Sequence, residues 1–253
     1  MSAKFEELDW SPTPIGEVSL RRRVDPVTGV DIYEVKLGDE FLMSSMFTAA
    51  EIALSRLALE RLAVTRAHQP TWDVVVGGLG LGYTAHRVLE DPRVRSLVVV
   101  ELLEPVIDWH QRGLVPVGPV LTADARCRLV QGDFFAMARS ATAGGEAHAN
   151  SGFDPEAPGR IFDAVVLDID HAPDHFLDGA SAGFYSVGAT RELAEHLAPG
   201  GVYAIWSNDP PDQTYVDVLS QVFDDVVAEV ITFPNPLQDR DATATVYVGT
   251  KSL

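Results

Sequence analysis

The sequence predicts an α/β protein whose main part is a doubly wound sheet of seven mostly parallel strands. From Trp72 onward, short runs of consecutive apolar residues alternate with helical stretches, a pattern typical of a parallel sheet that helices cover on both faces. The last two apolar runs, at 227–233 and 244–248, have no helix between them and should form a C-terminal antiparallel hairpin. In such sheets ligands bind beyond the carboxyl ends of the parallel strands, so we expect the site there.

The beginning of the chain follows a different pattern. Residues 17–20 and 32–37 alternate polar and apolar side chains on either side of a turn at 25–29, which predicts a small antiparallel β-element. This element is too short to be stable alone. We therefore divide the chain into an N-terminal β-element, residues 1–46, and a main domain, residues 47–253.

The main domain should open with a helix. Thr48 and Glu51 have the spacing of a capping box, in which the Thr48 hydroxyl accepts from the Glu51 amide. The strands expected before the hairpin are 73–76, 96–100, 127–130, 162–167 and 202–206. The expected helices are 52–64, 83–89, 105–111, 134–138, 189–197 and 214–223.

Composition limits the kinds of partner. Of 253 residues, 37 are Asp or Glu and 19 are Lys or Arg, which gives a formal net charge of −18. Such a surface repels phosphate backbones and anionic lipids, so we expect neither nucleic acid nor membrane as a partner. The single cysteine, Cys127, excludes an intrachain disulfide and should be buried packing. The basic run 21–23 should be a solvated strand face, and the polar N-terminus lacks a signal peptide, which favours a cytoplasmic protein.

A glycine-rich turn and an acidic strand end predict a nucleoside site. The first parallel strand runs into Gly78, Gly80 and Gly82, where the backbone can turn sharply and approach a ligand. Glu101, 19 residues after Gly82, ends the next strand, and a carboxylate there can accept both hydroxyl hydrogens of a ribose. We expect Leu102 to lie beside the same ligand. The alternative is a tight turn and a surface glutamate.

The third strand ends in Asp133 and Phe134. Asp133 can accept a hydrogen bond from an adenine amino group while Phe134 packs against the ring. Asp133 is also placed to be a helix N-cap, and the two roles can coexist.

The fourth strand ends in the densest ionisable cluster of the main domain, Asp168, Asp170, His171, Asp174 and His175. Carboxylates in an apolar cleft repel one another, which raises their pKa, and they can hold a cation or act as a base. We expect Asp168 to be the catalytic base, and Asp170 and His171 to face the acceptor. Metal ligation is the less favoured alternative because Pro173 interrupts the helical spacing that would align the ligands.

Other residues are expected near the acceptor. Trp206 and Asn208 follow the fifth strand and should shape the acceptor pocket together with Tyr185; core packing is the alternative for Trp206. Residues 139–160, rich in Ala, Gly, Ser and Pro, should form either a lid over the site or a mobile surface insertion.

In this order the motifs resemble class I S-adenosylmethionine-dependent transferases, and among them the spermidine synthase-like, or polyamine aminopropyltransferase-like, branch. The resemblance spans roughly residue 30 to the end of the chain. It implies a Rossmann-like fold, S-adenosylmethionine or its decarboxylated form as the cofactor, a small-molecule acceptor and a homodimer. It rests on Asp39–Phe41 followed by Met46, Gly78, Gly80, Gly82, Glu101, Pro105–Ile107, Gly132–Asp133, Asp168 and Leu197–Gly201.

The chain departs from that branch where amines would bind. Aminopropyltransferases of the branch carry an aspartate inside the glycine loop, where this chain has Leu79 and Leu81. After the Asp-Glu-Phe they carry Tyr, Glu and His, where this chain has Met43, Ser45 and Ala49.

The acidic pair departs as well, since one residue rather than two separates Asp168 from Asp170. Polyamines need carboxylates or aromatic faces to replace lost hydration. These losses predict methyl transfer from S-adenosylmethionine to a small molecule. Aminopropyl transfer, with Asp168 deprotonating an amine, is the alternative, and a non-catalytic nucleoside-binding protein is the second. A metal-assisted O-methyltransferase using Asp168, Asn208 and Asp209 is the least favoured.

Overall fold

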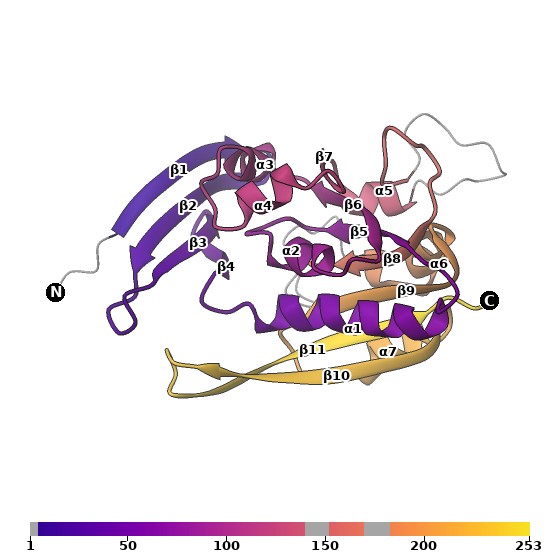
Figure 1. Cartoon of the computed structure of the whole chain (residues 1–253). Helices are drawn as coiled ribbons and strands as arrows, with labels where there is room; N and C mark the ends of the chain where they lie inside the picture. The colour runs from indigo at the N-terminus through magenta and orange to yellow at the C-terminus, as the bar shows by residue number, and fades with distance from the viewer. Residues whose placement is uncertain (1–4, 140–151, 170–182) are drawn as a thin grey trace.

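The computed structural model describes residues 5–139, 152–169 and 183–253, which form two sheets and their covering helices (Figure 1). The first sheet is antiparallel, in the order β1-β2-β3-β4. The second has seven strands in the order β10-β11-β9-β8-β5-β6-β7, with β11 antiparallel to both β9 and β10. The prediction of a doubly wound, mostly parallel sheet with a C-terminal hairpin behind a small β-element is therefore confirmed.

The strands of the small sheet are β1 (Phe5–Thr13), β2 (Gly16–Val24), β3 (Asp31–Leu37) and β4 (Glu40–Ser44). Those of the main sheet are β5 (Trp72–Gly77), β6 (Val94–Glu101), β7 (Cys127–Gln131), β8 (Phe162–Leu167), β9 (Leu197–Ser207), β10 (Asp224–Asn235) and β11 (Arg240–Thr250). The helices are α1 (Ala49–Thr65), α2 (Tyr83–Leu89), α3 (Glu104–Gln111), α4 (Gly118–Ala123), α5 (Phe134–Arg139), α6 (Val187–Glu195) and α7 (Gln213–Leu219).

The order of strands reverses at β5. This strand pairs in parallel with β6 on one side and with β8 on the other, so that Gly77 lies opposite both Val100 and Leu167. A reversal of this kind leaves a crevice at the carboxyl ends of the strands. It brings together the glycine turn after β5, Glu101 at the end of β6 and Asp168 after β8.

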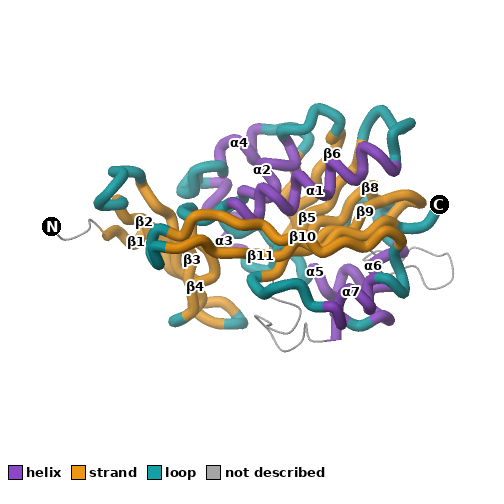
Figure 2. Tube along the Cα trace, turned by 90° about the horizontal axis from the view of Figure 1, so that it is seen from below, coloured by secondary structure: helices purple, strands orange, loops and turns teal. Residues whose placement is uncertain are grey.

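Helices cover both faces of the main sheet, and Figure 2 shows α1, α2 and α4 on one side with α5, α6 and α7 on the other. Each face has its own apolar core. One contains α1 and α2 and includes Trp72 and Trp109; the other contains α5, α6 and α7 and includes Phe153 and Tyr203. The β5 and β8 strands are buried along their whole length, which explains their uninterrupted apolar sequence.

Some local predictions are wrong. The Thr48 side chain makes no capping hydrogen bond, so the capping box does not form. Arg21 and Arg23 are not solvated: both are half-buried and pair with the buried Glu34, with Arg23 Nε 2.7 Å from Glu34 Oε1. They neutralise a carboxylate that would otherwise be buried without a counter-charge.

Three elements were predicted differently or not at all. Strand β1 and helix α4 were not predicted, and Leu197–Gly201, expected to end a helix, opens strand β9.

Cys127 is half-buried, and burial raises the pKa of its thiol to about 12. In the part of the chain that the structure describes, no helix combines the length and apolar character needed to cross a bilayer.

Candidate functional site

The glycine turn is built from backbone that only glycine adopts easily. Gly78, Gly80 and Gly82 have φ angles of +91°, +48° and +89°. A Cβ on Gly78 would overlap the carbonyl oxygen of Asp168, and one on Gly80 would overlap the Met43 side chain. The turn therefore packs directly against the end of β8 and against the small sheet.

Glu101 is buried beneath this turn, where its carboxylate accepts backbone hydrogen bonds from Leu79 (3.0 Å) and Leu103 (2.8 Å). Burial raises the pKa of Glu101, and the surrounding amides oppose that rise. A carboxylate offers about four lone-pair sites. The amides of Gly80 and Leu102 also face this carboxylate, which lines the cavity. Its ribose-binding role stays a prediction.

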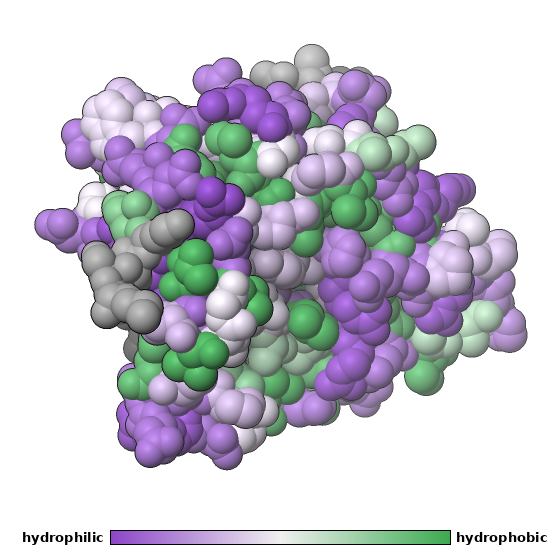
Figure 3. All heavy atoms as spheres, turned by 60° about the vertical axis from the view of Figure 1, so that its left-hand side comes forward, coloured by the Kyte–Doolittle hydropathy of each residue, from purple (hydrophilic) through white to green (hydrophobic). Residues whose placement is uncertain are grey.

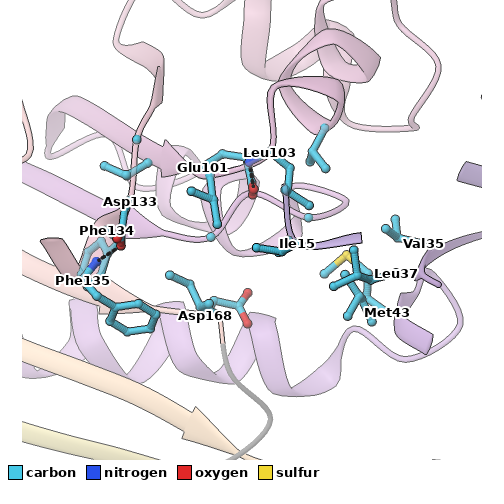
Figure 4. Close-up of a pocket in the computed structure, with 18 of the residues that line it drawn as sticks. Ile15, Val35, Leu37, Met43, Glu101, Leu103, Asp133, Phe134, Phe135 and Asp168 are labelled. Atoms are coloured by element: carbon cyan, nitrogen blue, oxygen red, sulfur yellow. Dashed lines mark hydrogen bonds between the residues drawn. The ribbon is translucent and has the colours of Figure 1, made fainter. Parts of the chain in front are cut away.

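Asp133 lies on the same cavity and caps α5. Its Oδ1 accepts from the amides of Phe135 (2.9 Å) and Ala136 (3.1 Å), as Figure 4 shows for Phe135. The N-cap role is thus confirmed, and Oδ2 takes no part in these two bonds. The adenine-binding role stays a prediction.

Phe134 also lines the cavity but belongs mostly to the core. It is 2% exposed, and its ring stacks on Phe153 with 4.7 Å between centroids. The neighbouring Phe135 is half-buried and lines the same cavity. Because the chain turns into α5 at this point, Phe135 is the more accessible ring, which the sequence pattern alone did not indicate.

Asp168 follows β8 and lines the cavity, as Figure 4 shows. The Thr84 hydroxyl donates to its Oδ2 at 2.5 Å, and the Trp206 indole faces it. Burial raises the pKa of Asp168 to about 6, while Thr84 and Trp206 favour the ionised form. An acid with this pKa is suited to exchange protons near neutral pH.

Glu51 is a functional candidate that sequence reasoning missed. It lies in the first turn of α1, where burial and the charge of Asp168 raise its pKa to about 8. The backbone amide of Glu51 favours the ionised carboxylate, and no Lys, Arg or His of the described residues forms an ion pair with it. Both residues are half-buried and their charges interact, so we treat them as an acid pair. Sequence analysis considered Glu51 only as the partner of Thr48 in the capping box.

A wall of apolar side chains closes the cavity on the side of the small sheet. Met43 joins this wall to the glycine turn, because its Sδ accepts from the Leu81 amide at 2.8 Å. Sequence analysis did not assign these residues to the site, since they are ordinary apolar strand residues. The wall consists of Ile15, Val35, Leu37, Leu42 and Met43 (Figure 4).

Other predicted residues divide into three groups. Trp206 and Leu102 line the cavity, and Leu102 is 45% exposed. Tyr185 is instead buried among rings of the second core, next to Phe184, and Asn208 is exposed away from the cavity lining. Their assignment to the acceptor pocket is not supported by their positions.

Part of the predicted site lies outside the described residues: Asp170, His171, Asp174 and His175. Within the described ranges, no three His, Cys, Asp or Glu side chains are grouped to hold a metal ion.

The predicted lid, 139–160, is described only at its ends. Arg139 lines the cavity. At the other end, Arg160 pairs with Asp154 (2.8 Å) and with Asp73 at the amino end of β5, away from the site. The segment therefore returns to the opposite edge of the sheet, while its central part, 140–151, lies outside the described residues.

No protein-family model matches the sequence. Three solved structures each align with 97% of the chain, and so include both sheets. The spermidine synthase from Thermotoga maritima has a TM-score of 0.65, 15% identity and 73% of its own chain covered. A spermidine synthase in complex with the transition state analogue AdoDATO has a TM-score of 0.64, 14% identity and 72% covered. A probable spermidine synthase from Corynebacterium glutamicum ATCC 13032 has a TM-score of 0.60, 17% identity and 79% covered.

The chain has the spermidine synthase fold. This confirms the resemblance drawn from the glycine turn, Glu101, Asp133 and Asp168 as far as the fold is concerned. In this chain the small sheet supplies the apolar wall, and Glu101, Asp133 and Asp168 lie at the ends of main-sheet strands. On the face that Figure 3 presents, patches of apolar side chains lie in the middle among hydrophilic ones.

Proposed function

We propose that this chain is an aminopropyltransferase, which moves the aminopropyl group of decarboxylated S-adenosylmethionine to an amine. The observation that carries the proposal is the acid pair, Asp168 and Glu51, close to Glu101 beneath the glycine turn. Two carboxyl groups without a cation of their own fit an ammonium donor or an amine acceptor. The structural relatives support aminopropyl transfer over the methyl transfer that the sequence departures favoured.

The donor fits the cavity by its polar groups. In this proposal Glu101 holds the ribose hydroxyls, and Asp133 and Phe135 recognise the base. Gly78 has no side chain, so the backbone can come close to the part of the donor that carries the sulfonium. The relative with the bound analogue AdoDATO supports a nucleoside of this kind. Asp168 supplies the negative field that a positively charged donor requires, and Glu51 adds to it when the bound cation favours its ionised form.

The chain's own groups bring the acceptor into position. Asp168 accepts a hydrogen bond from the acceptor nitrogen and takes one proton from it, so that the nitrogen lone pair becomes available. When bound, the donor supplies a carbon next to its sulfonium, where the nitrogen–carbon bond forms as the carbon–sulfur bond breaks and sulfur becomes a neutral thioether. The apolar wall excludes water from the reacting atoms. The proton leaves Asp168 to solvent after product release.

Methyl transfer is the second candidate, favoured by one observation. Leu79 and Leu81 are buried in the glycine turn, so the turn offers no carboxylate to an aminopropyl ammonium. A methyl donor keeps its own carboxylate and does not need one there.

Identification of the nucleoside product separates the two reactions. The protein is incubated with either donor and a panel of amines, phenols and acids, and the nucleosides are analysed by mass spectrometry. Aminopropyl transfer leaves 5′-methylthioadenosine, which is the expected result. S-Adenosylhomocysteine would replace the proposal by methyl transfer, and no product with either donor would favour a non-catalytic nucleoside-binding protein.

A further inference from the structure

We propose that the acceptor is a primary monoamine with an apolar hydrocarbon body, and that the small sheet selects it against diamines and polyamines. The inference rests on the proposed function in that the acceptor is an amine. It specifies which amine, from the side chains that surround the acceptor half of the cavity.

The apolar wall comes from three separate parts of the small sheet. Ile15 lies in the turn between β1 and β2, Val35 and Leu37 lie on one face of β3, and Leu42 and Met43 lie on β4. The pairing of β3 with β4 is irregular between Val35 and Lys36. This irregularity accounts for Leu42 and Met43, which are consecutive, both lining the cavity.

The two charged residues that flank Val35 on β3, Glu34 and Lys36, lie on the other face of that strand. Glu34 alternates with Val35 along β3 and is neutralised by Arg21 and Arg23. Lys36 packs over the exposed Phe41 ring at 5.5 Å. Neither Glu34 nor Lys36 lines the cavity beside Val35 and Leu37, so an ammonium lying on the wall would lose hydration without a replacement.

Asp168 and the apolar wall line one continuous cavity. Asp168 lines it at the end of β8, and Met43 joins the wall to the glycine turn through the Leu81 amide. A primary amine at Asp168 therefore has its hydrocarbon part against Met43, Leu42 and Leu37. One ammonium and one apolar body match this arrangement, whereas a second ammonium does not.

Binding in the presence of the product nucleoside tests the inference independently of turnover. Titration calorimetry is performed with 5′-methylthioadenosine present, using butylamine, hexylamine and octylamine against putrescine and 1,8-diaminooctane. We expect affinity to rise three- to fourfold for each added methylene, which corresponds to about 0.8 kcal/mol. We expect each diamine to bind at least tenfold more weakly than the monoamine of equal length. Equal or tighter binding of the diamines, or no binding of any monoamine, would overturn the inference.

A substitution in the wall provides the second arm. Leu42→Glu places a carboxylate on the wall, and we expect it to weaken octylamine binding at least tenfold and to strengthen 1,8-diaminooctane binding. Val27→Asp is the matched control, because Val27 is 89% exposed in the β2–β3 turn of the same sheet. If the two variants behave alike, the wall does not select the acceptor. Monoamine selectivity without any aminopropyl product would leave this inference standing and remove the proposed reaction.

Discussion

At the scale of single residues, Asp168 and Glu51 lower the stability of the folded protein but suit it to bind a cationic ligand. Each carboxyl group is partly removed from water, and the charge of Asp168 raises the cost of ionising Glu51. Neither has an arginine or lysine partner among the described residues, in contrast to Glu34, which has two. Natural proteins keep such groups mainly where a ligand uses them.

Replacing Asp168 by asparagine should reduce kcat by about 10²–10⁴-fold, because the group that takes the acceptor proton is lost. Donor affinity should change little. In the wild-type protein the rate should rise with pH through about 6 as Asp168 loses its proton, and this limb should vanish in the variant. Steady-state kinetics between pH 5 and 9 measure both effects.

The control for that substitution is Asp217→Asn, an exposed aspartate on α7 whose carboxylate accepts a hydrogen bond from Gln213. It should leave the kinetics unchanged. A normal rate in Asp168→Asn would remove Asp168 as the base.

Replacing Glu51 by glutamine should stabilise the protein at alkaline pH. The folded-state pKa of Glu51 is raised to about 8 from its usual 4.5, so the folded protein keeps a proton that the unfolded chain has released. Wild-type stability therefore falls as pH rises from about 4.5 to about 8, and the variant should escape that loss by about 1–2 kcal/mol at pH 8. Urea unfolding at pH 5 and pH 8 measures the difference.

Glu60→Gln is the matched control, since Glu60 is exposed on the same helix and pairs with Arg56. It should change stability by less than about 0.5 kcal/mol at either pH. A Glu51→Gln protein that is less stable than wild type at pH 8 would show that the carboxylate is satisfied in the folded state.

The residues that sequence reasoning identified share one property: backbone geometry dictates them. Gly78 and Glu101 were predictable because a glycine turn after one strand and an acidic residue at the end of the next are typical of a nucleoside site. Glu51 was not, because a glutamate three positions after a threonine at a helix start has a local explanation. Only the position of α1 above β8 brings it near Asp168.

At the scale of elements, continuous apolar runs located the main sheet well. β8 has the predicted bounds, and β5 extends one residue further at each end, because buried parallel strands leave little ambiguity. The misses have physical reasons. β1 is mostly polar and exposed, and α4 is a short helix that begins with Gly-Pro, so neither shows a clear period.

The glycine turn is the element whose disruption should be most severe. In Gly78→Ala, a side chain at φ +91° would meet the Asp168 carbonyl, so we expect a loss of about 1–3 kcal/mol in stability and weaker nucleoside binding. Gly188→Ala is the control: this glycine lies in α6 with open space around it, and alanine there should be neutral or stabilising by up to about 1 kcal/mol. Thermal unfolding with and without nucleoside compares them, and equal effects would mean that the turn has no special role.

At the scale of the whole molecule, the site depends on two sheets joined by few residues. The main sheet supplies the nucleoside side and could be predicted from sequence motifs. The apolar wall could not, because Ile15 and Met43 become neighbours of Asp168 only when the small sheet packs over the glycine turn. The acids on the nucleoside side of the site also favour a donor with a net positive charge.

The most direct test of the central claim is side-by-side calorimetry with decarboxylated S-adenosylmethionine and S-adenosylmethionine. The carboxylated form brings a second negative group toward Asp168 and Glu51, and like charges in a buried site repel strongly. We predict that the decarboxylated form binds at least about tenfold more tightly, and that Glu51→Gln reduces this preference. Tighter binding of S-adenosylmethionine would contradict aminopropyl transfer and restore methyl transfer as the function.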